Sequence, residues 1–99
     1  MPPPLHVRDE AAADIDAAFS WYEARSAGVG TQFLTEVRRV LKGIEATPLR
    51  HPVIRDPVRR ALLRTFPYGL FYLADSEYTV VIACSHFRQS PRHWFRRAP

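Results

Sequence analysis

The sequence has very little sulfur and no long apolar run. Its one cysteine, Cys84, cannot form an internal disulfide bond, which fits a reducing compartment. No stretch approaches the roughly 18 consecutive apolar residues that a membrane-spanning helix needs. The first residues also lack the charged-then-apolar order of a signal peptide. We therefore expect a cytoplasmic protein without a membrane partner.

Motifs for phosphate, metal or covalent chemistry are also missing. Gly28 and Gly30 lie between two expected helices, whereas a phosphate-binding loop joins a strand to a helix. Cys84 and His86 are two residues apart, but no carboxylate lies near them and the spacing matches no standard zinc site. Cys84 also ends the apolar run 80–84, which is typical of a small buried core residue. We expect no metal and no cofactor.

The charge is unevenly distributed along the chain. With 99 residues, of which 46% are hydrophobic, the chain is long enough for one modest core, so we expect a single domain over residues 1–99. Residues 1–57 carry seven Lys or Arg and eight acids, whereas residues 58–99 carry seven Arg and two acids. A basic half favours an acidic or polyanionic partner, although many small basic domains bind no nucleic acid.

The basic half has the pattern of strands. Residues 59–65, 68–74 and 78–87 are rich in β-branched and aromatic side chains, and the polar residues 75–77 separate the last two runs. The sequence Phe-Pro-Tyr-Gly at positions 66–69 marks a corner between the first two runs. This pattern predicts an antiparallel meander.

Two amphipathic helices are predicted in the first half. Residues 9 to about 26 carry an apolar stripe at helical spacing, and the glycines that follow end the helix. Residues from about 31 to 46 carry a second stripe, and Thr47-Pro48 ends that helix because the residue before a proline is pushed out of the α region. The stripes are Ile15, Ala18, Phe19 and Tyr22 in the first helix, and Phe33, Val37, Val40, Leu41 and Ile44 in the second. The short link predicts an antiparallel helical hairpin.

The remaining segments complete an α+β order. Residues 5–7 suit one short strand, residues 49–57 with two prolines suit an extended connector, and Ser90-Pro91 suits the start of a last helical turn. The order is β-α-α-β-β-β with a short C-terminal helix, which predicts a helical hairpin packed on an antiparallel β-sheet. Three acids lie off the stripe of the first helix and are expected on its solvated face: Asp14, Asp16 and Glu23.

The candidate contact residues gather in the basic half. His86 and Arg88 alternate along the last predicted strand and so point to one side, and Arg60 and Arg64 alternate along the first meander strand. If both pairs of side chains lie on the same face of the sheet, they form a shallow basic surface for a phosphate backbone or for the acidic face of a peptide. Alternatively, His86 hydrogen-bonds in the core and Trp94 caps the sheet edge. The full set is Arg60, Arg64, His86, Arg88, Arg92, Trp94 and Arg96.

The order and spacing of these features resemble the RelE/ParE superfamily of toxins. The resemblance covers nearly the whole chain and rests on Trp21-Tyr22, the segment 64–68, the aromatic strand containing Tyr72, and the closing segment 86–94. Such toxins belong to type II toxin–antitoxin, or plasmid stabilisation, modules. The resemblance therefore implies a cognate antitoxin encoded beside this gene, which forms a hetero-oligomer with the toxin. An amphipathic, partly disordered antitoxin segment is expected across the hairpin and along the sheet edge.

One branch of this superfamily consists of enzymes. RelE-like toxins enter the ribosomal A site and cleave mRNA, which needs basic groups at the scissile phosphate and an acid/base group. Arg60 and Arg88 match basic positions of that pattern. However, Gly69 stands where an arginine is expected, and Trp94 lies near the usual place of a tyrosine. The groups left to take the proton are His93 and His86.

The ParE-like branch shares the fold, lacks the nuclease residues and poisons DNA gyrase. The Phe-Pro-Tyr corner, the two comparatively long helices and the missing nuclease residues bring this chain closer to that branch. The resemblance then implies a binding inhibitor rather than an enzyme, with no agreed set of gyrase-contacting residues. A degenerate, non-toxic member is the third interpretation.

Overall fold

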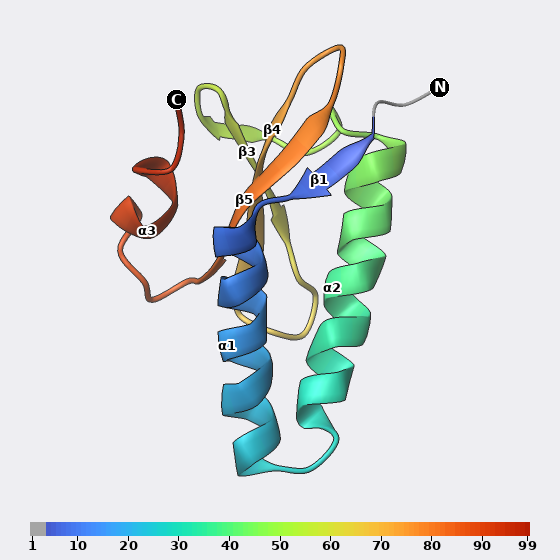
Figure 1. Cartoon of the computed structure of the whole chain (residues 1–99), viewed down its shortest axis with the longest axis vertical. Coiled ribbons are helices and arrows are strands. Elements are labelled where there is room, and N and C mark those ends of the chain that lie inside the picture. The colour runs from blue at the N-terminus through green and yellow to red at the C-terminus, as the bar shows by residue number, and fades with distance from the viewer. Residues whose placement is uncertain (1–3) are drawn as a thin grey trace.

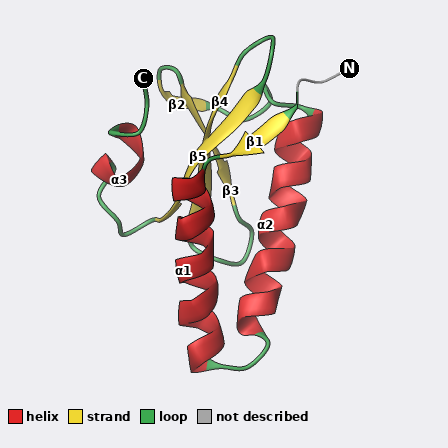
Figure 2. Ribbon diagram, viewed as in Figure 1, coloured by secondary structure: helices red, strands yellow, loops and turns green. Residues whose placement is uncertain are grey.

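A helical hairpin packs on a five-stranded sheet in the computed structural model, which describes residues 4–99 (Figure 1). The predicted α+β fold is confirmed. The helices and strands (Figure 2) are β1 Leu5–Val7, α1 Asp9–Arg25, α2 Val29–Ala46, β2 Val53–Arg55, β3 Val58–Leu62, β4 Tyr68–Ala74, β5 Thr79–His86 and α3 Arg92–Phe95. Within the described residues, no helix is long and apolar enough to cross a membrane.

The sheet has the strand order β1-β5-β4-β3-β2. The meander β3-β4-β5 is antiparallel, as predicted, whereas β1 pairs parallel to β5. The segment predicted as a plain connector contains β2, which pairs with β3 at the edge of the sheet. Pro52 and Pro57 flank this strand rather than interrupt it, and an edge strand tolerates prolines at its ends.

Two glycines allow the two long helices to pack closely against each other. Gly28 adopts a left-handed conformation with φ of 92°, which a residue without a side chain reaches at little cost. Gly30 lies inside α2 rather than in the link, and a Cβ atom there would come within 2.8 Å of the Phe19 ring. The Glu23 carboxylate accepts hydrogen bonds of 2.9 Å from the backbone N–H groups of Gly28 and Gly30, which satisfies donors at the start of α2.

The sheet buries apolar side chains on both faces. On the face covered by α1 and α2, the core includes Phe33, Leu70 and Tyr72. On the opposite, outer face, Trp94 of α3 stacks on Phe71 of β4, with ring centroids 4.8 Å apart and an interplanar angle of 12°. Trp94 therefore covers a face of the sheet rather than capping its edge. As a result, β5 is buried along nearly its whole length.

Candidate functional site

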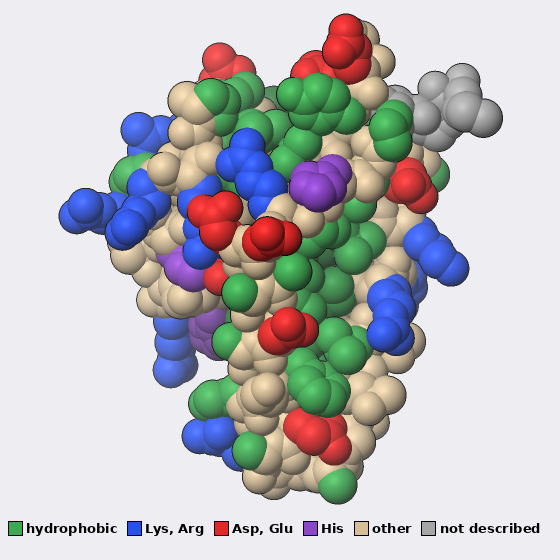
Figure 3. Space-filling model, viewed as in Figure 1, with side chains coloured by type: hydrophobic (Ala, Val, Ile, Leu, Met, Phe, Trp, Pro, Cys, Tyr) green, Lys and Arg blue, Asp and Glu red, His purple; other side chains and the backbone are tan. Residues whose placement is uncertain are grey.

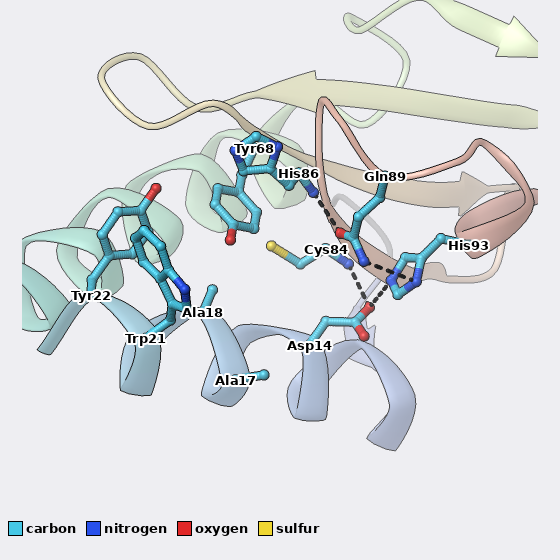
Figure 4. A pocket seen from close by; sticks show the side chains of 10 residues that line it. All are labelled: Asp14, Ala17, Ala18, Trp21, Tyr22, Tyr68, Cys84, His86, Gln89 and His93. Carbon is cyan, nitrogen blue, oxygen red and sulfur yellow. Dashed lines mark hydrogen bonds and ion pairs between the residues drawn. The ribbon is translucent and has the colours of Figure 1, made fainter. Parts of the chain in front are cut away.

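A pocket of about 420 Å³ opens between α1 and the end of β5 (Figure 4). Ala17 and Ala18 of α1 form one side, and Cys84 of β5 lies opposite them. Aromatic side chains close one end, and polar side chains close the other. The aromatic end consists of Trp21, Tyr22 and Tyr68, and the polar end of Asp14, Gln89 and His93; the His86 ring lies against Tyr68.

The Phe-Pro-Tyr corner holds the aromatic end in place. The Phe66 ring meets Tyr22 at 4.9 Å and Phe33 at 5.3 Å between centroids. The Tyr68 ring lies 5.2 Å from Phe33 and 5.0 Å from the His86 imidazole. Such edge-to-face contacts add to the burial of the rings themselves. The corner thus packs into the hairpin and fixes the pocket wall.

Asp14 is the centre of the polar end. Its carboxylate accepts hydrogen bonds from Arg97 Nη1 at 2.7 Å and from the Cys84 backbone N–H at 3.0 Å, and it lies 3.1 Å from His93 Nε2. The Asp14 side chain is only 11% exposed. The prediction of a solvated Asp14 was therefore wrong, because the C-terminal segment returns to cover this part of α1. Nothing local distinguishes Asp14 from the exposed Asp16, since its partner Arg97 lies 83 residues away.

Side chains close the free edge of β5. β1 pairs with β5 only as far as Val81, and no described strand continues along residues 82–86. Arg97 Nη1 donates to the Ile82 carbonyl at 3.0 Å, Asp14 accepts from the Cys84 N–H, and Gln89 Oε1 accepts from the His86 N–H at 2.8 Å. An uncovered strand edge offers unpaired backbone groups. Here these groups are bonded to side chains of α1 and the C-terminal segment.

The structure separates the predicted contact residues between two faces. His86 lies on the hairpin face, in the pocket. Arg60 lies on the outer face beside Phe71, and a Cβ atom on Gly69 would come within 3.2 Å of Arg60 Cγ. Arg60 and His86 therefore do not share one basic surface. The stem of Arg60 occupies space that the missing side chain of Gly69 leaves open.

Two arginines lie outside the strands to which the alternation argument assigned them. β3 ends at Leu62 and β5 ends at His86, so Arg64 and Arg88 belong to the loops that follow. The prediction that Arg64 and Arg88 alternate along these strands was wrong, because side chains alternate between the two faces only while the strand continues. Both arginines are exposed, as are Arg92 at the start of α3 and Arg96 after it. Among residues 4–99, ion pairs are found only at Asp14.

The pocket contains no activated nucleophile. Burial, followed by the nearby Asp14 charge, raises the pKa of Cys84 to about 12, so its thiol stays protonated at neutral pH. The prediction that Cys84 is a buried core residue is confirmed. Burial also raises the pKa values of Tyr22 and Tyr68. In the described part of the chain, no group of three or more His, Cys, Asp or Glu side chains could hold a metal ion.

Comparison with known proteins gives a match at the level of fold. No family model and no curated protein sequence matches this chain. Among solved structures, the fold is similar to that of a chain of the chromosomal ParDE TA system from P. aeruginosa, with a TM-score of 0.76 and 16% sequence identity. The match covers 85% of this chain and 95% of that chain. The expected RelE/ParE-like fold is confirmed.

Proposed function

We propose that this protein is the toxin of a type II toxin–antitoxin pair, and that it inhibits growth by binding DNA gyrase. A cognate antitoxin encoded beside it neutralises it by forming a hetero-oligomer. The observation that carries this proposal is the fold similarity to the ParDE-system chain, which extends over 95% of that chain. At this sequence identity the similarity concerns the fold, so the activity needs its own test.

The distribution of candidate catalytic groups favours the ParE-like branch over the RelE-like branch. Cleavage of RNA needs cations at the scissile phosphate and an acid/base group within hydrogen-bond reach of the reacting oxygen. Arg60 lies on the outer face against Gly69, where Trp94 and Phe71 are stacked. His93 contacts Asp14 in the pocket on the hairpin side. A phosphate held by Arg60 would therefore lack His93 as its proton acceptor.

A binding inhibitor instead needs exposed groups on a stable scaffold. Arg64, Arg88, Arg92 and Arg96 are each exposed, and exposed cations can attract an acidic or polyanionic partner. In this proposal they serve the target or the antitoxin, with no role in bond cleavage and no metal or cofactor.

The test is inducible expression of the chain without its antitoxin, with growth, plasmid supercoiling and transcript ends scored together. The proposal predicts growth arrest, inhibited supercoiling and intact transcripts. Growth arrest with transcripts cut at the ribosomal A site and normal supercoiling would support the nuclease instead. Normal growth at confirmed expression would support a non-toxic member of the fold.

A further inference from the structure

The pocket between α1 and β5 has the size of a small-molecule site. Its volume of about 420 Å³ lies within the usual range for such sites, whereas a cavity of about 150 Å³ already holds a benzene ring. The pocket therefore has room for a molecule of two fused rings. It opens to solvent beside Ala17 and Trp21, which are both exposed, so a ligand can enter without displacing a core side chain.

The walls of the pocket suit a flat ring system. The Trp21 and Tyr22 rings meet edge to face with centroids 5.1 Å apart, and the Tyr22 and Tyr68 rings do so at 6.1 Å. Ala18 of α1 and Cys84 of β5 carry small side chains, which leave the space between the aromatic and polar ends open (Figure 4). Because aromatic rings pair favourably with one another beyond the burial of their area, an aromatic ligand should bind better here than an aliphatic ligand of equal size.

The hydrogen bonds at the polar end have a fixed direction. Gln89 Oε1 accepts from the His86 backbone N–H at 2.8 Å, which orients the Gln89 amide. Gln89 Nε2 then faces His93 Nδ1 at 3.4 Å and donates to it, so His93 carries its proton on Nε2, 3.1 Å from Asp14. Gln89 Nε2 has a second N–H, which finds no acceptor among residues 4–99. The polar end therefore offers one free donor to a ligand.

No described side chain that lines the pocket carries an unpaired charge. The Asp14 carboxylate is paired with Arg97 at 2.7 Å. Both histidines of the pocket use Nδ1 as an acceptor, which is the pattern of a neutral imidazole. Burial raises the pKa values of Cys84 and Tyr68, so both groups stay protonated at neutral pH.

The cations of this region lie outside the pocket. Figure 3 shows Lys and Arg side chains along the side of the molecule where α3 faces α1, and none of them lines the pocket. An ionised ligand would therefore lose its hydration on entering without gaining a counter-charge, and such a loss is costly. The pocket thus favours a neutral ligand.

We infer that this pocket binds a neutral, bicyclic aromatic molecule that carries a carbonyl oxygen. The rings lie among Trp21, Tyr22 and Tyr68, and the carbonyl oxygen accepts the free N–H of Gln89. This site is separate from the proposed growth inhibition and does not depend on it, so each proposal is decided by its own test.

The probe is coumarin, a neutral two-ring molecule with one carbonyl group, titrated into the isotope-labelled full chain and followed by NMR. Ala17→Phe fills the mouth of the pocket, and Ala46→Phe makes the same change at an exposed alanine of α2 that does not line it. Gln89→Glu keeps an acceptor for the His86 N–H but removes the donor to the ligand. Thermal unfolding checks the fold, and all three midpoints should stay within about 4 °C of the parent protein.

We expect coumarin to shift the signals of residues that line the pocket, with a dissociation constant between about 0.1 and 1 mM. Ala46→Phe should bind it as the parent protein does, and Ala17→Phe at least about tenfold more weakly, since the added ring occupies the same space. Gln89→Glu should bind it about fivefold more weakly, because one hydrogen bond is lost. An anionic coumarin carboxylate should bind the parent protein at least about tenfold more weakly than coumarin does.

Four results would overturn the inference. Unchanged pocket signals at coumarin concentrations well above the expected dissociation constant would show that the pocket does not take this class of ligand. Equal binding by Ala17→Phe and the parent protein would place coumarin elsewhere on the molecule. Equal binding by Gln89→Glu would exclude the carbonyl contact, and tighter binding of the carboxylate than of coumarin would exclude a preference for neutral ligands.

Discussion

At the scale of single residues, Asp14 connects three segments that are distant in the sequence. It receives hydrogen bonds from Arg97 and from the backbone of Cys84, and it contacts His93. Removing one partner of a mostly buried ion pair leaves the other charge and the backbone donor without compensation. The effect of a substitution should therefore exceed that of an ordinary surface change.

We predict that Asp14→Ala lowers the free energy of unfolding by about 2–3 kcal/mol. Asp16→Ala, at an exposed position two residues away, should change it by under about 0.5 kcal/mol. Urea unfolding of the two variants measures both values. Similar small losses in both would mean that the Asp14 contacts contribute little net stability.

At the scale of elements, two glycines of α2 differ sharply in their surroundings. A Cβ atom at Gly30 would lie 2.8 Å from the Phe19 ring, so the two helices approach each other closely there. At Gly43, no described atom outside the helix's own backbone lies within 4 Å of the Cβ position. The same substitution should therefore have opposite effects at the two positions.

We predict that Gly30→Ala destabilises the protein by about 1–3 kcal/mol, since an added methyl group forces the hairpin apart. Gly43→Ala should stabilise it by about 0.5–1 kcal/mol, because alanine is the better helix former. Circular dichroism during urea unfolding measures both. The packing argument fails if Gly30→Ala is as stable as Gly43→Ala.

Glu36 links α2 to the loop between β3 and β4. Its carboxylate accepts hydrogen bonds from the backbone N–H of Arg64, and from the N–H and hydroxyl of Thr65 at 2.8 and 2.6 Å. Burial tends to raise the pKa of Glu36, but the bonds from Thr65 and Arg64 together hold this pKa below its usual value. The folded state therefore favours the ionised form.

The consequence is a loss of stability in acid. Because the folded pKa lies below the unfolded one, this contribution is present above the unfolded pKa of about 4.3 and declines as pH falls below it. We predict that Glu36→Gln lowers stability at pH 7 and weakens its dependence on pH between about 5 and 3. Thermal midpoints measured across that range test this. Parallel pH profiles for the parent and the variant would contradict it.

At the scale of the whole molecule, the C-terminal segment completes two surfaces at once. Trp94 covers the outer face of the sheet at Phe71, and Arg97 caps the edge of β5 at Ile82. Without this segment, an apolar face and a strand edge would be open together. Both features promote association between chains.

We predict that removal of residues 91–99 yields a protein that binds a hydrophobic dye and self-associates. Removal of Pro99 alone, which is exposed, should leave the behaviour unchanged. Dye fluorescence and size-exclusion chromatography provide the readouts. A monomeric, dye-free truncated chain would show that the sheet does not depend on this cover.

Local patterns in the sequence predicted most elements of this molecule. The hairpin follows from helical spacing, and residues 68–74 form β4 with the predicted bounds, since each signal lies within a few neighbouring residues. β2 was missed because three residues between prolines carry too weak a pattern. Arg60 and His86 lie on opposite faces of the sheet because of how their strands pair. Asp14 contacts Arg97 because the C-terminal segment returns to α1. Neither can be read from local spacing.

The contact between Asp14 and Arg97 also bears on the order in which parts of the molecule fold. It closes a loop of 83 residues, and the entropy lost on closing a loop increases with its length. Local contacts, such as those within the hairpin, form early in folding, whereas contacts between distant residues tend to form late. The polar end of the pocket is therefore among the last parts of the molecule to assemble. In a nascent chain, the hairpin would form well before this end of the pocket is complete.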